Sequence, residues 1–321
     1  MNFQRLVCGL LAALMLALPV AAQTFPGKAL RIVVPFGAGG VADLTARTVA
    51  QKLSESLGQP VVIDNKPGAG GVVAGDAVAK AEPDGHTLLL MSNGTAVSAG
   101  LFKSLPFDTV RDFAPVSTLG FFDIALITPA DSKFKNLGEL LAFARANPGK
   151  VNLGSINVGS TQNLAAELFK TSAGVDMQIV PFNGTPAVIT ALRGGQLDAA
   201  VEILGPVLPQ IKANALRALA VTGDKRAAVL PDVPTAKESG LPTFVASSWN
   251  ALAAPAKTPK DVIARLNKEI NAAVNSADVK KKLADLNVEA RASSPEQAAA
   301  LLASETKRWG DVIVRAKIPT Q

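Results

Sequence analysis

The chain has 321 residues, which is long for one hydrophobic core and suits two domains of about 150 residues each. Hydrophobic residues make up 48% and charged residues only 18%, so the composition excludes a mainly disordered chain. The single Cys excludes a disulfide framework, and the single His argues against a histidine-rich metal site. A net charge of +6 is small for a chain of this length that binds nucleic acid. We therefore expect no metal, no cofactor and no nucleic-acid partner.

The first 22 residues have the pattern of an export signal. Arg5 precedes the apolar run Leu6–Leu18, and small residues follow up to Ala22, after which we expect cleavage. The apolar run is shorter than the roughly 20 residues that a membrane-spanning helix needs. Cys8 has no apolar run before it, which argues against a lipid anchor. The sequence therefore predicts an exported, periplasmic protein.

Apolar runs alternate with helical patterns in the part that follows. Strands are predicted at 30–36, 60–64 and 86–91, and helices at 41–57 and from 71 to about 81. Continuous apolar strands between helices indicate a parallel sheet that is covered on both faces. The first half of the chain therefore predicts an α/β lobe.

The same rhythm restarts after an apolar run at 121–128. The later predicted elements are a helix at 136–146, a strand at 151–154, a helix at 164–170, strands at 177–182, 198–203, 216–222 and 249–254, and tail helices at 260–276, 278–286 and 294–317. These patterns predict two α/β lobes with a helical tail that docks on them. Ligands of open α/β sheets bind at the carboxyl ends of the strands.

The turn Pro35–Asp43 is the first candidate binding element. Gly37, Ala38, Gly39 and Gly40 let backbone N–H groups approach a ligand without interference from large side chains. The helix that begins here offers unpaired N–H donors and a partial positive charge, which together favour an anion.

Three further turns open helices at the ends of predicted strands. Gly159, Ser160, Thr161 and Gln162 precede one helix, and Ser160 or Thr161 is a suitable N-cap. Asn183 and Gly184 precede another helix with Pro186 in its first turn, and Ser92 and Asn93 end the third strand. Four such turns in two lobes predict helix N-termini that face a shared cleft.

A dinucleotide site is the alternative interpretation of the first turn. Gly37 to Ala42 fits the pattern G-x-G-x-x-A, and Asp64 ends the next strand. Export argues against this dehydrogenase-like interpretation, because free dinucleotides are found mainly in the cytoplasm. No motif of a nucleophilic, phosphate-binding or zinc enzyme is present, so we expect no catalytic residues.

Several motifs together resemble the Bug family, the extracytoplasmic solute-binding proteins of tripartite tricarboxylate transporters. They keep the family's order over the whole mature chain, and they are Arg31–Asp43, Asn65–Gly71, Pro83–Leu89, Arg111–Val116, Gly194–Asp198, Leu216–Thr222 and Leu230–Thr235. The resemblance implies a type II periplasmic-binding-protein-like α/β fold with two lobes, a ligand cleft and a strand hinge. It implies lobe 1 at 23–124 plus 246–321 and lobe 2 at 125–245.

The resemblance also implies a small anionic solute, typically a carboxylate such as a di- or tricarboxylate, an aromatic carboxylate or an acidic amino acid. Its carboxyl groups are expected between the turn Phe36–Gly40 with Asp43 and the turn Gly159–Gln162, partly through water. Ser92, Asn93, Asn183 and Gly184 are expected to line the sides, and Glu202 stands where the family commonly has Asp.

The expected partners are the membrane permease subunits of such a transporter, and we expect a monomer. A sensing module that docks on a receptor kinase is the other binding function that the sequence allows.

Overall fold

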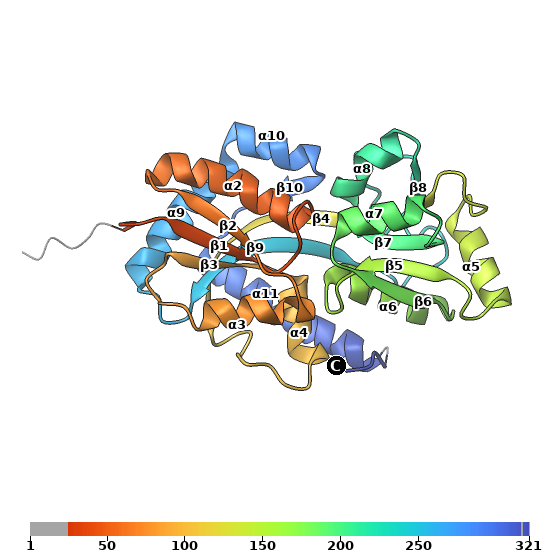
Figure 1. The fold of residues 1–321 in the computed structure, drawn as a ribbon, viewed down its shortest axis with the longest axis horizontal. Coiled ribbons are helices and arrows are strands. Elements are labelled where there is room, and N and C mark those ends of the chain that lie inside the picture. Colours follow the sequence, from red (N-terminus) through yellow and green to blue (C-terminus); the bar gives the residue numbers. More distant parts are fainter. Residues whose placement is uncertain (1–24, 316, 321) are drawn as a thin grey trace, which may run out of the picture.

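The structure is a computed structural model that describes residues 25–315 and 317–320. The predicted export signal at 1–22 lies outside the described residues. Two groups of strands and helices lie side by side, and two long strands run between them (Figure 1). The mixed α/β fold with two lobes is therefore confirmed.

The first lobe contains a parallel sheet in the order β2-β1-β3. Helix α2 covers it through an apolar stripe that includes Ala46, Val49 and Leu53, and Gly58 ends the helix in the left-handed conformation at φ 66°. The elements of this lobe are β1 (Leu30–Val34), α2 (Val41–Leu57), β2 (Val61–Asn65), η1 (Ala69–Gly71), α3 (Val72–Ala79), β3 (Thr87–Ser92) and α4 (Asn93–Leu101).

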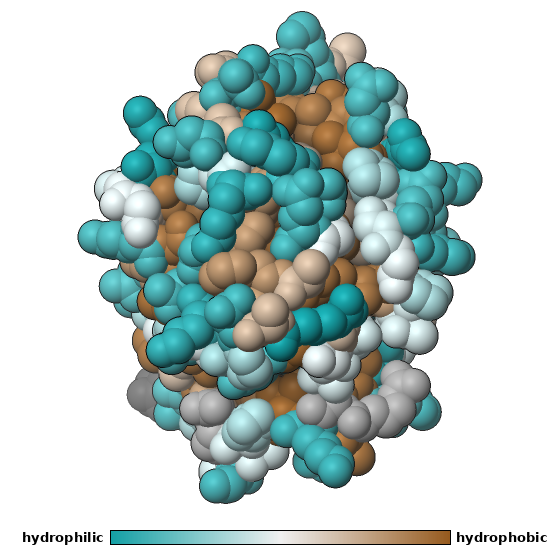
Figure 2. Space-filling view, turned by 90° about the vertical axis from the view of Figure 1, so that its right-hand side faces the viewer, coloured by the Kyte–Doolittle hydropathy of each residue, from teal (hydrophilic) through white to brown (hydrophobic). Residues whose placement is uncertain are grey.

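The second lobe repeats this arrangement with the parallel order β7-β5-β6. Its elements are α5 (Leu137–Ala146), β5 (Asn152–Ile156), α6 (Thr161–Ala173), β6 (Gln178–Phe182), α7 (Thr185–Arg193), β7 (Ala199–Ile203), α8 (Leu204–Lys212) and β8 (Leu216–Val221). Hydrophilic residues cover most of the end face of this lobe, with apolar residues visible between them (Figure 2). Its helices therefore turn their apolar sides toward the sheet.

The predicted parallel sheet of the first three strands is confirmed, but the strands at the centre of the molecule are antiparallel. Strands β4 (Phe113–Pro129) and β9 (Ser247–Pro255) run antiparallel to each other, and β9 is also antiparallel to β3. Both strands are mostly buried, on both faces, between the lobes. A strand that is buried on both faces is apolar along its whole length whether its neighbours are parallel or antiparallel, so the sequence pattern does not distinguish the two.

Strand β4 changes partners along its length. It pairs with β9 through Asp123 and with β7 from Ile124 onward. Because β4 passes from the partners of one lobe to those of the other near residue 124, we propose that lobe 1 comprises 23–124 with 246–321 and that lobe 2 comprises 125–245.

The C-terminal elements dock on the first lobe and on the junction. They are α9 (Lys260–Asn275), α10 (Ala277–Asp285), β10 (Val288–Ala290) and α11 (Pro295–Arg315). Helix α9 packs on α2, and α11 packs on α4, where Trp309 is fully buried. Within the described part of the chain, no helix is both long and apolar enough to cross a bilayer.

Candidate functional site

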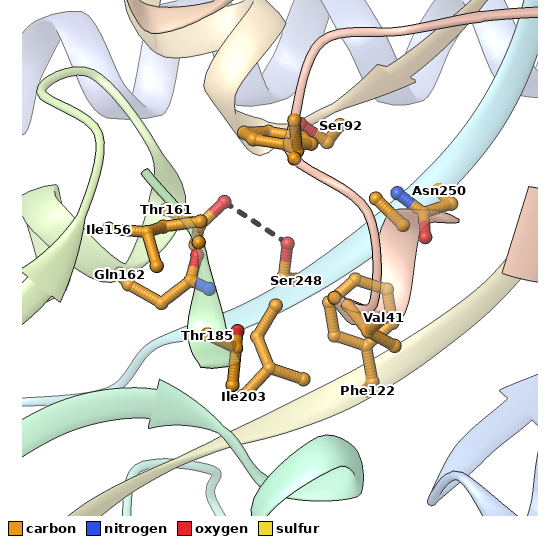
Figure 3. Close-up of a pocket in the computed structure, with 15 residues that line it drawn as sticks. Val41, Ser92, Phe122, Ile156, Thr161, Gln162, Thr185, Ile203, Ser248 and Asn250 are labelled. Carbon is orange, nitrogen blue, oxygen red and sulfur yellow. Dashed lines mark hydrogen bonds between the residues drawn. The ribbon is translucent and has the colours of Figure 1, made fainter. Parts of the chain in front are cut away.

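A pocket lies where the two lobes meet over the crossing strands (Figure 3). The pocket and its opening to solvent together contain about 380 Å³ of space free of protein atoms. All of its lining residues are uncharged, and they are Phe36, Gly37, Gly40, Val41, Ala42, Ser92, Phe122, Ile156, Thr161, Gln162, Gly184, Thr185, Ile203, Ser248 and Asn250. Among the described residues no cluster of His, Cys, Asp and Glu could hold a metal ion.

Asp43 fixes the shape of the first turn from outside the pocket. Its carboxylate accepts hydrogen bonds of 3.0 Å from the Gly39 N–H, from Arg47 Nε and from Asn65 Nδ2. Gly39 has φ 83°, a conformation that favours glycine. Burial would raise the pKa of Asp43, but the hydrogen bonds from Arg47, Gly39 and Asn65 outweigh it and hold this pKa below its usual value. The ionised Asp43 therefore organises the N-terminus of α2.

Replacing Asp43 with Asn should destabilise the protein by about 1–3 kcal/mol, because it removes charge-assisted hydrogen bonds to a buried carboxylate. The matched control is Asp64→Asn, since Asp64 is more exposed and its ion pairs with Arg31 and Lys66 are long, at 3.6 and 3.5 Å. Such surface pairs contribute about 0–1 kcal/mol. Urea unfolding at neutral pH measures both variants, and equal losses of stability in the two would contradict this role of Asp43.

The entry of α6 is built by residues that do not line the pocket themselves. Ser160 caps the helix, because its Oγ accepts the Asn163 N–H at 3.1 Å and donates to the Ile156 carbonyl at 3.0 Å. Gly159 has φ 83°, and a Cβ on it would lie 2.9 Å from Gly70 Cα of the other lobe. Thr161 and Gln162 line the pocket at the start of the helix. Their N–H groups belong to the first turn and therefore have no carbonyl partner within the helix.

The other two helix entries differ in construction, since α4 has a side-chain cap and α7 does not. Ser92 caps α4, which begins at once at Asn93, and its Oγ accepts the Gly94 N–H at 3.1 Å. Asn93 Nδ2 donates to the Ser247 carbonyl at 2.6 Å, which ties α4 to β9. Gly184 precedes α7 and lines the pocket. Together with α2 and α6, all four helices whose entries were singled out in the sequence therefore begin around this one space.

The lobes contact each other on two sides of the pocket. A Cβ on Gly37 would lie only 2.5 Å from the Asn183 carbonyl oxygen, so the first turn meets the turn before α7 backbone to backbone. Gly70 and Gly159 form the second such contact. Inside the pocket Thr161 Oγ1 and Ser248 Oγ are 3.1 Å apart and form a hydrogen bond (Figure 3). The structure therefore shows the two lobes closed on each other.

Glu202 lies behind the pocket wall and is fully buried. Its Oε2 accepts hydrogen bonds from Thr185 Oγ1 at 3.0 Å, from the Ile203 N–H at 3.2 Å and from Gln162 Nε2 at 3.3 Å. Its Oε1 has no partner among the described residues. Burial raises the pKa of Glu202 to about 7, although these hydrogen bonds act in the opposite direction. Thr185 and Gln162 line the pocket, so Glu202 acts on the site through them.

The sequence-predicted residues come together around one space, but only some of them face it. Phe36, Gly37, Gly40, Ser92, Thr161, Gln162 and Gly184 line the pocket. The predicted residues that shape or support it from behind are Gly39, Asp43, Asn93, Gly159, Ser160, Asn183 and Glu202. Ala38 is exposed and does not line the pocket.

The sequence interpretation missed the floor of the pocket. Ser248 and Asn250 come from β9, and Phe122 comes from β4. Residues two apart on a strand share a face, so a polar residue at every second position of an otherwise apolar strand was the available signal. The apolar wall of Val41, Ile156 and Ile203 was also missed.

Comparisons with known proteins place the chain among solute receptors. Residues 45–318 match the family described as "Tripartite tricarboxylate transporter family receptor". Protein BugT of Bordetella pertussis (strain Tohama I) is 38% identical over 98% of this chain and 98% of its own.

Solved structures agree with this result. The periplasmic binding protein BugD has a TM-score of 0.89 at 30% identity and covers 92% of this chain and 100% of its own. MatC from Rhodopseudomonas palustris with bound malate has a TM-score of 0.86 at 34% identity, with coverages of 90% and 100%. R. palustris Rpa4515 with adipate has a TM-score of 0.89 at 32% identity, with coverages of 92% and 100%.

Proposed function

Since the chain belongs to the tripartite tricarboxylate transporter receptor family, whose members are periplasmic solute-binding proteins, we propose that it captures a small carboxylate between its lobes. It delivers this solute unchanged to the membrane permease subunits of such a transporter. We further propose that residues 1–22 direct export and are removed, and that the mature protein is a monomer. The structural neighbours with malate and adipate support a carboxylate as the ligand class.

The observation that carries this proposal is the meeting of four helix N-termini at one uncharged pocket. Each helix start provides free N–H donors and about half a positive charge, so the main chain neutralises an anion without a Lys or Arg. One hydrogen bond to a charged group contributes about 1.5–3 kcal/mol. Four or five of them, less the cost of ordering, reach the roughly −8 kcal/mol of a micromolar site.

Calorimetry with adipate and with its uncharged diamide tests the proposal directly. The diamide has nearly the same shape, so the difference between the two ligands reports on recognition of the charge. We expect a carboxylate of the panel (adipate, malate, aromatic carboxylates and acidic amino acids) to bind in the micromolar range and its amide to bind at least about tenfold more weakly. No binding across the panel, or equal binding of acid and amide, would overturn the proposal.

Salt should have little effect on this affinity. Buried interactions are screened much less than those of surface charges, so the dissociation constant should change less than about threefold between about 50 and 500 mM NaCl. Titrations with the tightest acid at several salt concentrations measure this. A steep loss of affinity with salt would instead place the binding charge on exposed Lys or Arg side chains.

A further inference from the structure

The floor of the pocket is one face of the central sheet. Asn250 on β9 pairs with Ser92 on β3, and Ser248 on β9 pairs with Phe122 on β4. Directly opposed residues of antiparallel strands have their side chains on the same face, as do residues two apart on one strand. All four residues line the pocket, and Figure 3 shows Asn250 away from the Thr161–Ser248 hydrogen bond.

Asn250 has a pocket-lining side chain whose hydrogen-bond donor and acceptor are both unpaired in the described part of the chain. It is 1% exposed, and neither its Nδ2 nor its Oδ1 has a partner among the described residues. The other amide in the pocket, Gln162, donates to Glu202, and Thr185 does the same. Leaving a buried donor and a buried acceptor unpaired is unfavourable, so the Asn250 amide is placed to bind something that enters the pocket.

The surroundings of Asn250 restrict what that group can be. Phe36, Val41, Phe122, Ile156 and Ile203 give the pocket an apolar wall, and no lining residue is charged. A second carboxylate at Asn250 would accept from Nδ2 but would also face the acceptor Oδ1. An apolar group would leave both atoms unpaired. A hydroxyl group both donates and accepts, so it satisfies the amide on both sides.

We infer that the solute is a carboxylate with an apolar body that carries a hydroxyl group, and that Asn250 selects this hydroxyl. The inference rests on the proposed function, because the helix N-termini hold the carboxylate while Asn250, whose strand pairs it with Ser92 at the start of α4, binds the hydroxyl group. It narrows the ligand class from carboxylates in general to hydroxylated acids with one carboxylate.

Matched pairs of acids test the inference by calorimetry. The pairs are benzoate with 3- and 4-hydroxybenzoate and hexanoate with 6-hydroxyhexanoate, and adipate represents a second carboxylate. We expect the hydroxyl group to improve the affinity of the wild-type protein by about tenfold in at least one pair, which is the size of one well-made buried hydrogen bond. Adipate should bind more weakly than the preferred hydroxy acid.

Asn250→Leu keeps the size of the side chain and removes its polar atoms, so it should abolish or reverse the preference for the hydroxyl group. Asn250→Ala serves as a second variant if Leu disturbs the fold, and Ser247→Ala, at an exposed neighbour on the same strand, is the matched control. A wild-type protein that binds acids without preferring the hydroxyl, or a preference that survives both Asn250 variants, overturns this inference and leaves the proposed function intact. Binding of no acid at all overturns both.

Discussion

Replacing Gly37 with Ala is expected to weaken solute binding by more than 100-fold while both lobes stay folded. The added Cβ would lie 2.5 Å from the Asn183 carbonyl oxygen, a backbone atom that cannot move away without its turn. Gly37 does not have a positive φ, so Ala fits the backbone of the isolated turn without strain. The clash exists only when the two turns meet, and closure of the lobes is what completes the pocket. A closed state disfavoured by about 3 kcal/mol weakens the apparent affinity by more than 100-fold.

The matched control is Gly310→Ala. A Cβ at Gly310 meets nothing within 4 Å, and this residue lies in the helix α11. Ala in place of a helical Gly stabilises a protein by about 0.5–1 kcal/mol, so this variant should bind as the wild type does and unfold at slightly higher temperature. Calorimetry with the tightest acid, thermal unfolding and small-angle scattering with and without that acid distinguish the cases. Gly37→Ala protein that binds and compacts like the wild type would refute the closure argument.

The helix entries could be predicted because their signals are local. A Gly, Ser or Asn at the end of an apolar run determines where a helix begins, whatever packs around it. Helix α2 therefore has the predicted bounds Val41–Leu57, and Ser160 caps α6 as the sequence suggests. The meeting of entries from two lobes followed from their positions at the carboxyl ends of predicted strands in both lobes.

Features that depend on distant parts of the chain were not predictable in this way. Helix α8 contains Pro209, and Pro206 lies in its first turn, where a missing N–H does no harm, so its sequence does not resemble a helix. Strand β10 has only three residues and exists because it pairs with β4. The orientation of Asn250 toward the pocket depends on the register of β9 between β3 and β4, which the apolar run alone does not reveal.

Glu202 illustrates the same limit inside the site. The family resemblance placed Glu202 among the expected binding residues, because it stands where the family commonly has Asp. The structure instead surrounds its carboxylate with Gln162, Thr185 and the Ile203 N–H, which only the packing of α6 and α7 on β7 brings together. A buried acid without a cationic partner makes stability depend on pH, and this dependence can be measured.

Glu202 should destabilise the protein increasingly as the pH rises from about 4.5 to 8.5. Burial raises its pKa from 4.5 to about 7 in the folded state, so the folded state holds a proton that the unfolded state has released. The stability associated with this proton is fully present below the unfolded pKa and is lost as the pH rises through about 7. A shift of this size corresponds to roughly 3 kcal/mol.

Glu202→Gln removes the ionisation and keeps the size of the side chain, so the variant should gain stability relative to the wild type by roughly 3 kcal/mol across this range.

The affinity of the wild-type protein for carboxylates should also fall with rising pH, because an ionised Glu202 places a negative charge behind Gln162 and Thr185. In the Glu202→Gln variant the affinity should depend less on pH. Glu238→Gln is the control, since Glu238 is exposed, pairs with Arg226 and stays ionised in both states above about pH 5. Urea unfolding at each pH gives the free energies, and a constant difference between wild type and Glu202→Gln would show that Glu202 does not titrate with folding.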